Sequence, residues 1–440
     1  MHEKVTKIAI ASRLILFCIQ FIANNVIKDH AADAFRSPKP SDFKESFLES
    51  FLNFFFSGFR RWDAEYYLHI AEYGYTYEHT LAFYPLFPGI VNILGRVFHL
   101  TIPYVSLRAT LLVTGIILNG YFFHRAANCL YDLTQKIFKD PHKSWNTIVL
   151  FCFNPASIFF SAPYSEGLFC WLTFSLMLEA SSRRMSFIKV SLALALSIVC
   201  RSNGLVNLGF PIYFALRSRS LYQMVKVIGI VLISLVPLTV YNFFAFQKFC
   251  SEGNLELFSA QPIEITNHAR SQNFVLADVV NKTDNSEWCD RPFPFPYSYI
   301  QRHYWDVGFL RYYQLKQLPN FLLAMPILLF LLCQSFKYFL GIFKNISSKG
   351  FIQTIIEKPT IPFVIHALFL TIFCALFVHI QVSTRLLASA TPCLYWFAVD
   401  LMPQTFQEVR LKSIGGGILF WFAGYFIVGT VLFSNFFPWT

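Results

Sequence analysis

Two carboxylates follow a tryptophan in the segment W-D-A-E at residues 62–65, directly after a strongly apolar run. Asp63 and Glu65 are candidate general bases, because transfer of a group to a hydroxyl requires a side chain that accepts the hydroxyl proton. Asp63 could instead be the N-cap of the short helix that the next residues predict. Glu65, His69 and Glu72 share one helical face, which suits a metal site but is more often an intrahelical hydrogen-bonded face.

Two arginines adjoin long apolar runs, Arg201 in R-S-N-G and Arg385 in Q-V-S-T-R. An unpaired arginine costs about 2.5 to 3.5 kcal/mol at the centre of a bilayer, and less toward the interface. A guanidinium donates two parallel N–H groups to phosphate oxygens, so both residues are candidate clamps for the phosphate of a lipid headgroup. The alternatives are that each arginine extends to the interface or pairs with Glu166.

The remaining candidates for substrate binding are polar and aromatic side chains in short segments beside apolar runs. They are Trp62, Tyr164, Glu166, Asn203, His303 and Trp305. Aromatic rings stack on the apolar faces of sugars, while neighbouring polar groups bind the sugar hydroxyls. The competing interpretation of the aromatic residues is the belt of tryptophan and tyrosine that membrane proteins place at the interface.

The composition indicates a membrane protein. Of the 440 residues, 55% are hydrophobic and only 14% are charged, which is too little polar surface for a soluble globule. Apolar runs of about 20 residues recur along the chain and predict one all-α polytopic domain over residues 1–440. The net charge of +11 is concentrated in short loops, as expected for cytosolic loops, and no basic face alternates with base-stacking aromatics. Nucleic acid is therefore not an expected partner.

About eleven transmembrane helices are expected, at 8–27, 104–126, 146–160, 163–180, 186–200, 204–216, 224–246, 318–338, 361–380, 386–401 and 415–433. The first is expected to be an uncleaved signal anchor with a cytosolic N-terminus. If the basic loops are cytosolic, two large lumenal loops remain, at about 28–103 and 247–317. Counting the apolar segment 81–100 as a span would place a lysine-rich loop in the lumen. We therefore expect a helix in the membrane interface there, with a short span as the alternative.

The second lumenal loop contains two further features. Cys250 and Cys289 both lie in it, and a disulfide between them suits an oxidising lumen. The sequon at 281–283 is a candidate for glycan addition, whereas the sequon at 345–347 falls in a cytosolic loop and should remain unmodified.

This topology brings all the candidate residues to the lumenal face. A site assembled from turns at one membrane face suits an enzyme that acts on a lipid-linked substrate. A transporter or scramblase of a lipid-linked sugar would instead place charges within its spans or show related halves, and the sequence shows neither. A non-catalytic subunit of a glycosylation complex is a third interpretation, and it would tolerate the loss of Asp63.

Six separated segments resemble the GPI mannosyltransferase II (PIG-V) family, whose members add the second mannose to the glycosylphosphatidylinositol precursor in the endoplasmic reticulum. They are W-D-A-E-Y-Y-L-H-I-A-E-Y-G-Y-T-Y-E-H-T-L-A-F-Y-P-L-F-P-G, N-P-A-S, A-P-Y-S-E, R-S-N-G-L-V, Y-W-D-V-G-F-L-R-Y-Y-Q-L-K-Q-L-P-N-F-L-L-A and T-R-L-L-A-S-A-T-P-C-L-Y-W. These segments occur in order over most of the chain.

The resemblance implies a GT-C fold in the endoplasmic reticulum membrane with an active site that faces the lumen. The implied donor is dolichyl-phosphate mannose. The implied acceptor is an inositol-acylated GPI-precursor glycolipid that carries glucosamine and one mannose, and the new bond is α1,6. No cofactor is implied, while a metal requirement and a small membrane partner subunit stay open. Another GT-C transferase that uses a polyprenyl-phosphate sugar is the nearest alternative.

On the family pattern, Asp63 matches the acidic residue of the first-loop motif and becomes the first choice of catalytic base, with Glu65 second. The donor bond is β and the product bond is α, which implies inversion by a single displacement. Arg201 and Arg385 would then stabilise the negative charge of the departing phosphate.

Overall fold

The computed structural model describes residues 1–39, 46–102, 104–182, 184–251, 261–277, 286–344, 358–403, 406–410 and 412–439. Within these ranges the chain is helical and contains no strand, and a single β-bridge joins Tyr77 to Leu276. The predicted all-α class is confirmed.

Four helices in the described part of the chain are long and apolar enough to cross a membrane. They are α1 (His2–Val26), α10 (Leu221–Phe249), the continuous helix Leu315–Lys344, most of which is α13 (Leu318–Lys344), and α18 (Ile414–Ser434). By length and composition, these helices indicate a membrane protein. The count of eleven spans stays a prediction.

The other predicted spans correspond to helices with different bounds. These are α5 (Leu107–Phe138), α6 (Pro141–Cys152), α7 (Glu166–Ala180), α8 (Phe187–Cys200), α9 (Gly209–Ser218) and α15 (Ile361–Phe377). The largest difference is in α5, which continues through the predicted loop after residue 126. Leu130 and Leu133 are fully buried on this extension, and burial of an apolar face is what stabilises most helices in proteins. Lys139, at a φ of 55°, ends α5.

The span predicted at 386–401 is broken into two short helices, α16 (Ser383–Ala390) and α17 (Cys393–Asp400). Thr391 is extended between them and Pro392 follows it. Proline disfavours the helical conformation of the preceding residue, which explains the break. Similar interruptions place the short 3₁₀ helices η3 (Ser157–Phe160) before α7 and η4 (Ser202–Leu208) before α9.

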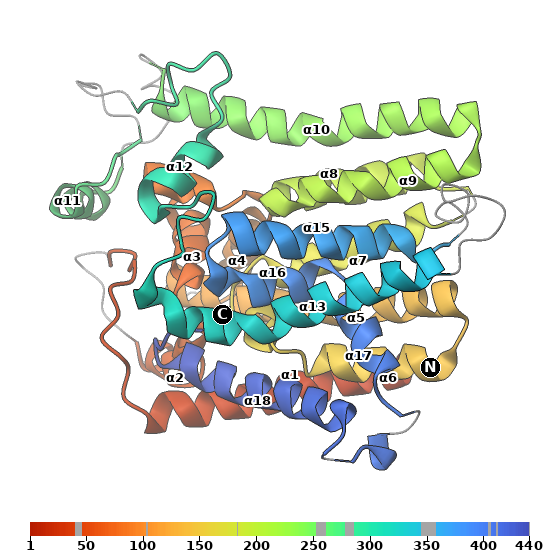
Figure 1. The fold of residues 1–440 in the computed structure, drawn as a ribbon. Coiled ribbons are helices and arrows are strands. Elements are labelled where there is room, and N and C mark those ends of the chain that lie inside the picture. The colour runs from red at the N-terminus through yellow and green to blue at the C-terminus, as the bar shows by residue number, and fades with distance from the viewer. Residues whose placement is uncertain are drawn as a thin grey trace.

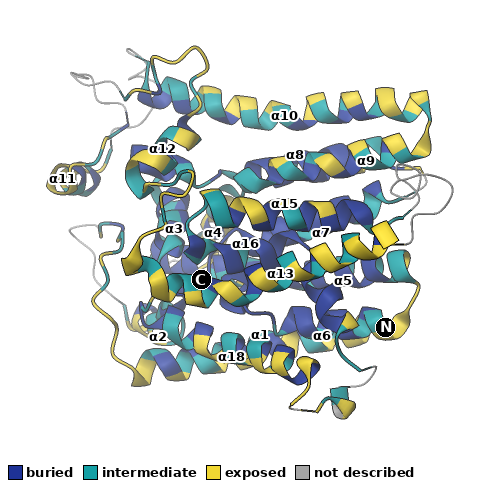
Figure 2. Cartoon of the chain, in the orientation of Figure 1, coloured by how far each residue is buried: buried dark blue, intermediate teal, exposed yellow. Residues whose placement is uncertain are grey.

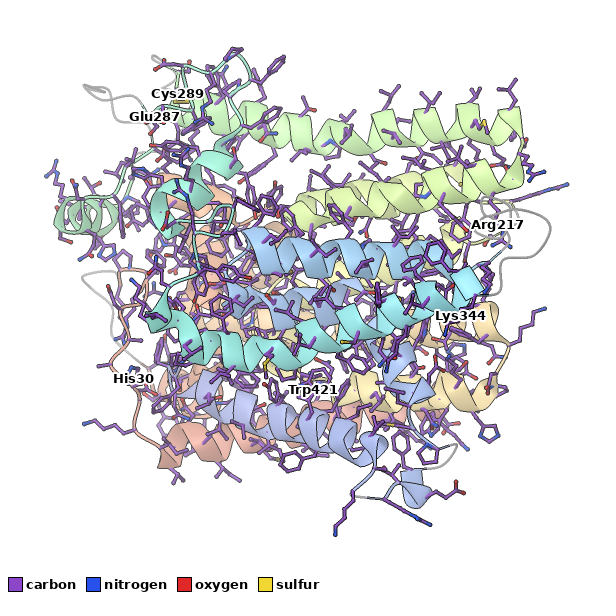
Figure 3. The ribbon with its side chains drawn as sticks, in the orientation of Figure 1. His30, Arg217, Glu287, Cys289, Lys344 and Trp421 are labelled. Carbon is purple, nitrogen blue, oxygen red and sulfur yellow. A yellow bond between two sulfur atoms is a disulfide. The ribbon has the colours of Figure 1, made fainter. Side chains whose placement is uncertain are left out.

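The long helices lie side by side, and shorter helices gather at one end of them, on the left in Figure 1. These are α2 (Phe47–Phe56), α3 (Asp63–Tyr73), α11 (Ile263–Gln272) and α12 (Pro296–Trp305). Two basic residues, Arg217 and Lys344, lie at the opposite end from Cys289 (Figure 3). The two segments predicted as large loops therefore meet at one end of the bundle, away from these basic residues.

Buried apolar side chains fill the interior of the bundle. Figure 2 shows α7 mostly buried, whereas α10 has many exposed residues along its length. Leu232 and Val240 of α10 are more than half exposed. A helix that exposes so many large apolar residues suits contact with lipid hydrocarbon rather than with water.

The segment predicted to lie in the interface forms η2 (Glu78–Ala82) and α4 (Leu86–Thr101). With 16 residues, α4 is about 24 Å long, shorter than the ~30 Å hydrocarbon core. It packs against α3 and α5 and exposes Ile93 and Val97. These features suit an interfacial helix, whose position in a membrane stays a prediction.

A disulfide closes the second predicted loop, and hydrogen bonds to Glu78 join this loop to the first. Cys250 and Cys289 form the expected disulfide, with their Cα atoms 5.4 Å apart. Next to it, the buried Trp288 donates its indole N–H to a carboxylate oxygen of Glu78 at 2.8 Å, and the Tyr304 hydroxyl donates to the other oxygen at 2.8 Å. Glu78 thus joins the second loop to the first. Both predicted sequons fall outside the described residues.

A partly buried arginine in α1, Arg13, was not singled out by the sequence analysis. The Arg13 guanidinium donates to the carbonyl oxygens of Cys152 (3.0 Å) and Ser157 (2.9 Å), and it lies 3.9 Å from the centroid of the Phe123 ring. These carbonyls lie where the chain breaks between α6 and η3, so Arg13 replaces hydrogen bonds that a continuous helix would make.

We expect Arg13→Met to destabilise the protein by on the order of 3 kcal/mol, because it leaves buried carbonyl groups without donors. Thermal unfolding in detergent measures the effect as a lower Tm. The control is Lys4→Met on the same helix, since Lys4 is exposed. Equal Tm values for the two variants would contradict this role for Arg13.

Candidate active site

Asp63 is the first residue of α3, and an unusual turn precedes it. Trp62 has a φ of 53°, in the left-handed region that residues other than glycine rarely adopt, and it contributes no side-chain cap to α3. The Trp62 ring instead packs edge-on against Phe436, with centroids 5.9 Å apart. Because Trp62 occupies the N-cap position, the interpretation of Asp63 as the helix cap is wrong.

The start of α3 is held by a tyrosine from a distant part of the chain. The backbone N–H of Asp63 donates to the hydroxyl of Tyr164 at 3.0 Å, and this hydroxyl donates to the carbonyl of Arg61 at 3.2 Å. Tyr164 is fully buried. The phenol satisfies a free N–H at the helix terminus, which leaves the Asp63 carboxylate available for other contacts.

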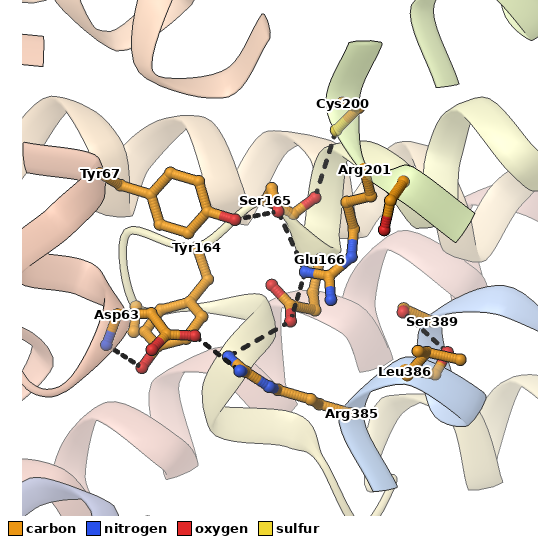
Figure 4. A network of polar contacts seen from close by, with 12 residues as sticks. Asp63, Tyr67, Tyr164, Ser165, Glu166, Cys200, Arg201, Arg385, Leu386 and Ser389 are labelled. Atoms are coloured by element: carbon orange, nitrogen blue, oxygen red, sulfur yellow. Dashed lines mark hydrogen bonds and ion pairs between the residues drawn. The ribbon is translucent and has the colours of Figure 1, made fainter. Parts of the chain in front are cut away.

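Four charged side chains form a chain of alternating sign (Figure 4). Arg385 Nη2 lies 2.6 Å from Asp63 Oδ2, and Arg385 Nη1 lies 3.6 Å from Glu166 Oε1. Arg201 Nη1 lies 2.6 Å from the same Glu166 oxygen. The Glu166 side chain is fully buried, whereas 30% of the Asp63 side chain is exposed. Asp63 is therefore the carboxylate that a substrate can reach.

Different helices position these four groups. Glu166 is the first residue of α7 and Arg201 is the C-cap of α8, so each charge has the sign that its helix terminus favours. Arg385 lies in the first turn of α16. Two guanidiniums compensate the buried Glu166 carboxylate, as a buried charge requires. The predicted alternative that each arginine pairs with Glu166 is confirmed for both, at 2.6 Å for Arg201 and 3.6 Å for Arg385.

A hydroxyl pair extends this network, and the sequence analysis did not identify it. Tyr67 Oη and Ser165 Oγ lie 2.7 Å apart, and Arg201 Nη1 donates to Ser165 Oγ at 3.1 Å (Figure 4). Ser165 is within the segment S-A-P-Y-S-E-G, and Tyr67 is one helical turn after Asp63. That spacing was the available signal, since residues four apart share one face of a helix.

Glu65, the second candidate base, is occupied by another partner. Arg60 donates to both of its carboxylate oxygens, at 2.8 and 2.9 Å, and only 9% of the Glu65 side chain is exposed. A carboxylate that is bound through both oxygens and shielded from solvent has little access to a substrate. The geometry therefore favours Asp63 over Glu65 for acid-base chemistry.

The other residues on the Glu65 face of α3 also have separate partners. His69 lies between Ser37 and Thr76, at 2.8 and 2.7 Å, and Glu72 pairs with Arg108 at 3.1 Å. Burial lowers the pKa of His69 well below its usual value, because the buried ring disfavours the charged form. Over the described ranges, no group of three His, Cys, Asp or Glu side chains is arranged to hold a metal.

The remaining predicted residues divide between the network and its surroundings. Two buried donors have no hydrogen-bond partner, Trp62 Nε1 and Asn203 Nδ2. Trp62 directly precedes Asp63 in the sequence, and Asn203 is two residues after Arg201. Trp305 packs against Tyr66, with ring centroids 6.1 Å apart. His303 is exposed and stacks on Tyr299, so it is not part of the network.

An aromatic cluster adjoins Asp63. Tyr66, one turn along α3, stacks on Phe35 and on Phe83 with centroids 4.4 and 4.5 Å apart. Burial, and to a lesser extent the charge of Asp63, raise the pKa of Tyr66, so this hydroxyl stays protonated as a donor. The cluster places aromatic rings and the Tyr66 hydroxyl beside a reachable carboxylate, a combination that carbohydrate sites use.

Comparison with known proteins covers the whole chain. The sequence model of the family described as mannosyltransferase (PIG-V) matches residues 2–440. A protein of Drosophila melanogaster named GPI mannosyltransferase 2 is 44% identical over 454 residues, which cover 100% of both chains. A human protein named GPI alpha-1,6-mannosyltransferase 2 is 32% identical over 508 residues, which cover 100% of this chain and 99% of the relative. A fission-yeast protein named GPI mannosyltransferase 2 is 28% identical over 86% of this chain.

Proposed function

The chain belongs to the PIG-V mannosyltransferase family, and on this premise we propose that it adds the α1,6-linked second mannose to the GPI precursor. The proposed donor is dolichyl-phosphate mannose and the proposed acceptor is the inositol-acylated glycolipid that carries glucosamine and one mannose. The proposed setting is a GT-C fold of about eleven spans in the endoplasmic reticulum membrane, with the site facing the lumen. The observation that carries the proposal is the reachable Asp63, which pairs with Arg385 and is connected through Glu166 to Arg201, within a full-length match to mannosyltransferases.

The proposed reaction is one displacement. The 6-hydroxyl oxygen of the acceptor mannose attacks the anomeric carbon of the donor mannose while Asp63 accepts the hydroxyl proton. The bond from that carbon to the phosphate oxygen breaks, and dolichyl phosphate leaves with the electron pair. Attack opposite to the leaving group inverts the β bond to an α bond.

Arg385 and Arg201 have the chemistry to stabilise the leaving phosphate, because preorganised guanidiniums need little rearrangement as its negative charge develops. Glu166 holds both of them, at 3.6 and 2.6 Å, so it is a positioning residue in this proposal. Trp62 and Asn203 supply unpartnered donors for sugar hydroxyls. The aromatic cluster around Tyr66 supplies the stacking surface.

Donor binding would also change the state of the base. Two guanidiniums now face two carboxylates, and Arg385 is paired with Asp63. A phosphate that takes over the Arg385 fork removes that partner and adds a negative charge nearby. The Asp63 carboxylate then loses its ion pair with Arg385, so its oxygens are free to bind the acceptor hydroxyl when the donor is bound.

Cells that lack the second GPI mannosyltransferase test the proposal. Expression of this chain should restore GPI-anchored proteins at the cell surface, measured by flow cytometry. Failure of a normally expressed, membrane-inserted chain to restore them would reject the acceptor assignment. A transporter or scramblase function is not favoured, because the full-length match is to mannosyltransferases.

The two sequons test the proposed orientation. We expect a glycan on Asn281 and none on Asn345, because the first lies in the predicted lumenal loop and the second in a predicted cytosolic loop. Glycosidase treatment should shift the mobility of the wild-type protein but not that of Asn281→Gln. The matched control is Asn345→Gln, which should shift like wild type. A glycan mapped to Asn345 would contradict the predicted topology.

A further inference from the structure

A second polar site lies in the large loop between α10 and α13. It is a pocket of about 420 Å³ lined by Glu287, Arg291, Ser298, Tyr299, Arg302, His303 and Arg311. The lining residues come from α12 and from the segments before and after it. Glu287 and Cys289, labelled in Figure 3, mark this end of the molecule. The volume is in the range of small-molecule sites.

The pocket has an excess of positive charge. Arg311 pairs with Asp306 at 2.7 Å, and Arg291 lies 3.9 Å from Glu287. Both carboxylates are more than half exposed, where ion pairs contribute little. Over the described ranges, Arg302 makes no ion pair. Three guanidiniums therefore line the pocket together with one carboxylate, that of Glu287.

The helix terminus explains only part of this arrangement. Arg302 and His303 lie in the last turn of α12, where positive charge is favourable. Arg291 precedes α12 in the chain and Arg311 follows it, so neither belongs to that last turn. Their convergence on the same pocket indicates an anionic ligand that several guanidinium forks can bind.

The surroundings of the pocket indicate that the anion belongs to a lipid. Large apolar side chains in the adjacent segments are exposed: Phe293 (74%), Phe295 (53%), Phe309 (60%) and Leu315 (93%). The last of these begins the long apolar helix Leu315–Lys344. A basic pocket bordered by exposed apolar residues at the end of a membrane helix is typical of the level at which headgroup phosphates lie.

The position of the pocket relative to Asp63 distinguishes the two substrates. Ile300 and Tyr304 form the inner face of α12, where Ile300 is fully buried and Tyr304 binds Glu78. Tyr299, Arg302 and His303, at i, i+3 and i+4, form another face and line the pocket. The body of α12, roughly 10 Å across, thus separates the pocket from the aromatic cluster beside Asp63.

The donor phosphate is bonded directly to the mannose that is transferred, so it cannot occupy this pocket while that mannose is at Asp63. The acceptor phosphate is separated from the reacting mannose by inositol and glucosamine, which can extend past α12. We therefore propose that this pocket binds the phosphodiester of the acceptor glycolipid. The proposal rests on the proposed function, because that function supplies the acceptor.

Acceptor kinetics in phosphatidylcholine nanodiscs test this site at saturating donor. The variant is Arg291→Gln/Arg302→Gln, and the matched control is Arg270→Gln, an exposed arginine of α11 in the same loop. We expect the variant to raise the acceptor KM roughly tenfold, as the loss of charge-assisted hydrogen bonds predicts, with kcat and the donor KM unchanged. The control should behave as wild type.

A synthetic acceptor that lacks the phosphate separates this role from a structural one. Wild type should show the raised KM with this acceptor, and the variant should show no further increase, because the interacting partner is already absent. An equal effect of the variant on both acceptors would overturn the proposal. Absence of transfer to either acceptor by wild-type enzyme would instead reject the proposed function.

The phosphate could also come from a bulk phospholipid, and a lipid titration distinguishes this source. When phosphatidylserine replaces part of the phosphatidylcholine, the ratio of the acceptor KM of the variant to that of wild type should stay the same. If phosphatidylserine raises the KM of wild type until it equals that of the variant, the pocket binds bulk lipid and the proposal is overturned.

Discussion

Asp63→Asn is expected to lower kcat by roughly 10²- to 10⁴-fold, the usual contribution of general base catalysis. Asparagine keeps the shape of the side chain but cannot accept the hydroxyl proton. The measurement is single-turnover transfer of labelled mannose from saturating donor to acceptor in nanodiscs. The N-terminus of α3 should stay intact, because Tyr164 contacts the backbone N–H of residue 63 and not its side chain.

Glu65→Gln is the matched control, since it makes the same chemical change two residues away. Glu65 is buried and bound by Arg60, so we expect a lower Tm and a kcat within a few-fold of wild type in the folded fraction. If Glu65→Gln loses turnover and Asp63→Asn keeps it, Glu65 rather than Asp63 is the base. Wild-type turnover in Asp63→Asn would remove general base catalysis by this residue.

The sequence predicted the charged residues of the site better than the contacts among them. Asp63, Glu166, Arg201 and Arg385 stood out because charges beside apolar runs are costly and rare. Their order of contact, with Glu166 between the two arginines, depends on how α7, α8 and α16 meet. Residues separated by 322 positions, such as Asp63 and Arg385, can be paired only once the packing of the helices is known.

The residues that the sequence analysis missed are ordinary in type. Tyr67 and Ser165 resemble many other aromatic and small polar residues in this chain, and their role comes from one hydrogen bond across two helices. Arg13 was assigned to a simple membrane anchor, whereas its partners are carbonyls freed by a helix break far along the chain. A local pattern predicts a helix, but it does not predict which distant backbone groups will need a donor.

Helix ends were the least accurate part of the fold prediction, and the reasons are local. Hydropathy alone predicted a single span at 386–401, although the sequence T-P within it disfavours a continuous helix. The same windows ended the second span at residue 126, although α5 continues to Phe138. Both errors arise because apolar content measures suitability for the membrane rather than the continuity of hydrogen bonding.

Arg385→Lys is expected to lower turnover by roughly 10²-fold or more, the scale seen when a preorganised donor to a developing charge is lost. Lysine keeps the positive charge, but it cannot contact Asp63 and Glu166 through two separate nitrogens as Arg385 does, at 2.6 and 3.6 Å. Arg201→Lys should also lower turnover, since Arg201 shares Glu166. Mannose transfer at saturating donor and acceptor measures both effects, and normal turnover in both variants would remove the arginines from the site.

Measurements of donor affinity distinguish two roles of Arg385. In the first, the donor phosphate replaces Asp63 as its partner; in the second, the ion pair with Asp63 is purely structural. If donor phosphate replaces Asp63 on Arg385, then Asp63→Asn removes the competing carboxylate, and donor affinity should rise roughly fivefold while turnover is lost. Arg385→Gln should weaken donor binding at least tenfold. In the double variant the gain from Asp63→Asn should disappear, because the guanidinium for which the two anions compete is absent. Weaker donor binding by Asp63→Asn in an enzyme of normal Tm would contradict the exchange and leave Arg385 as a group that only orients Asp63.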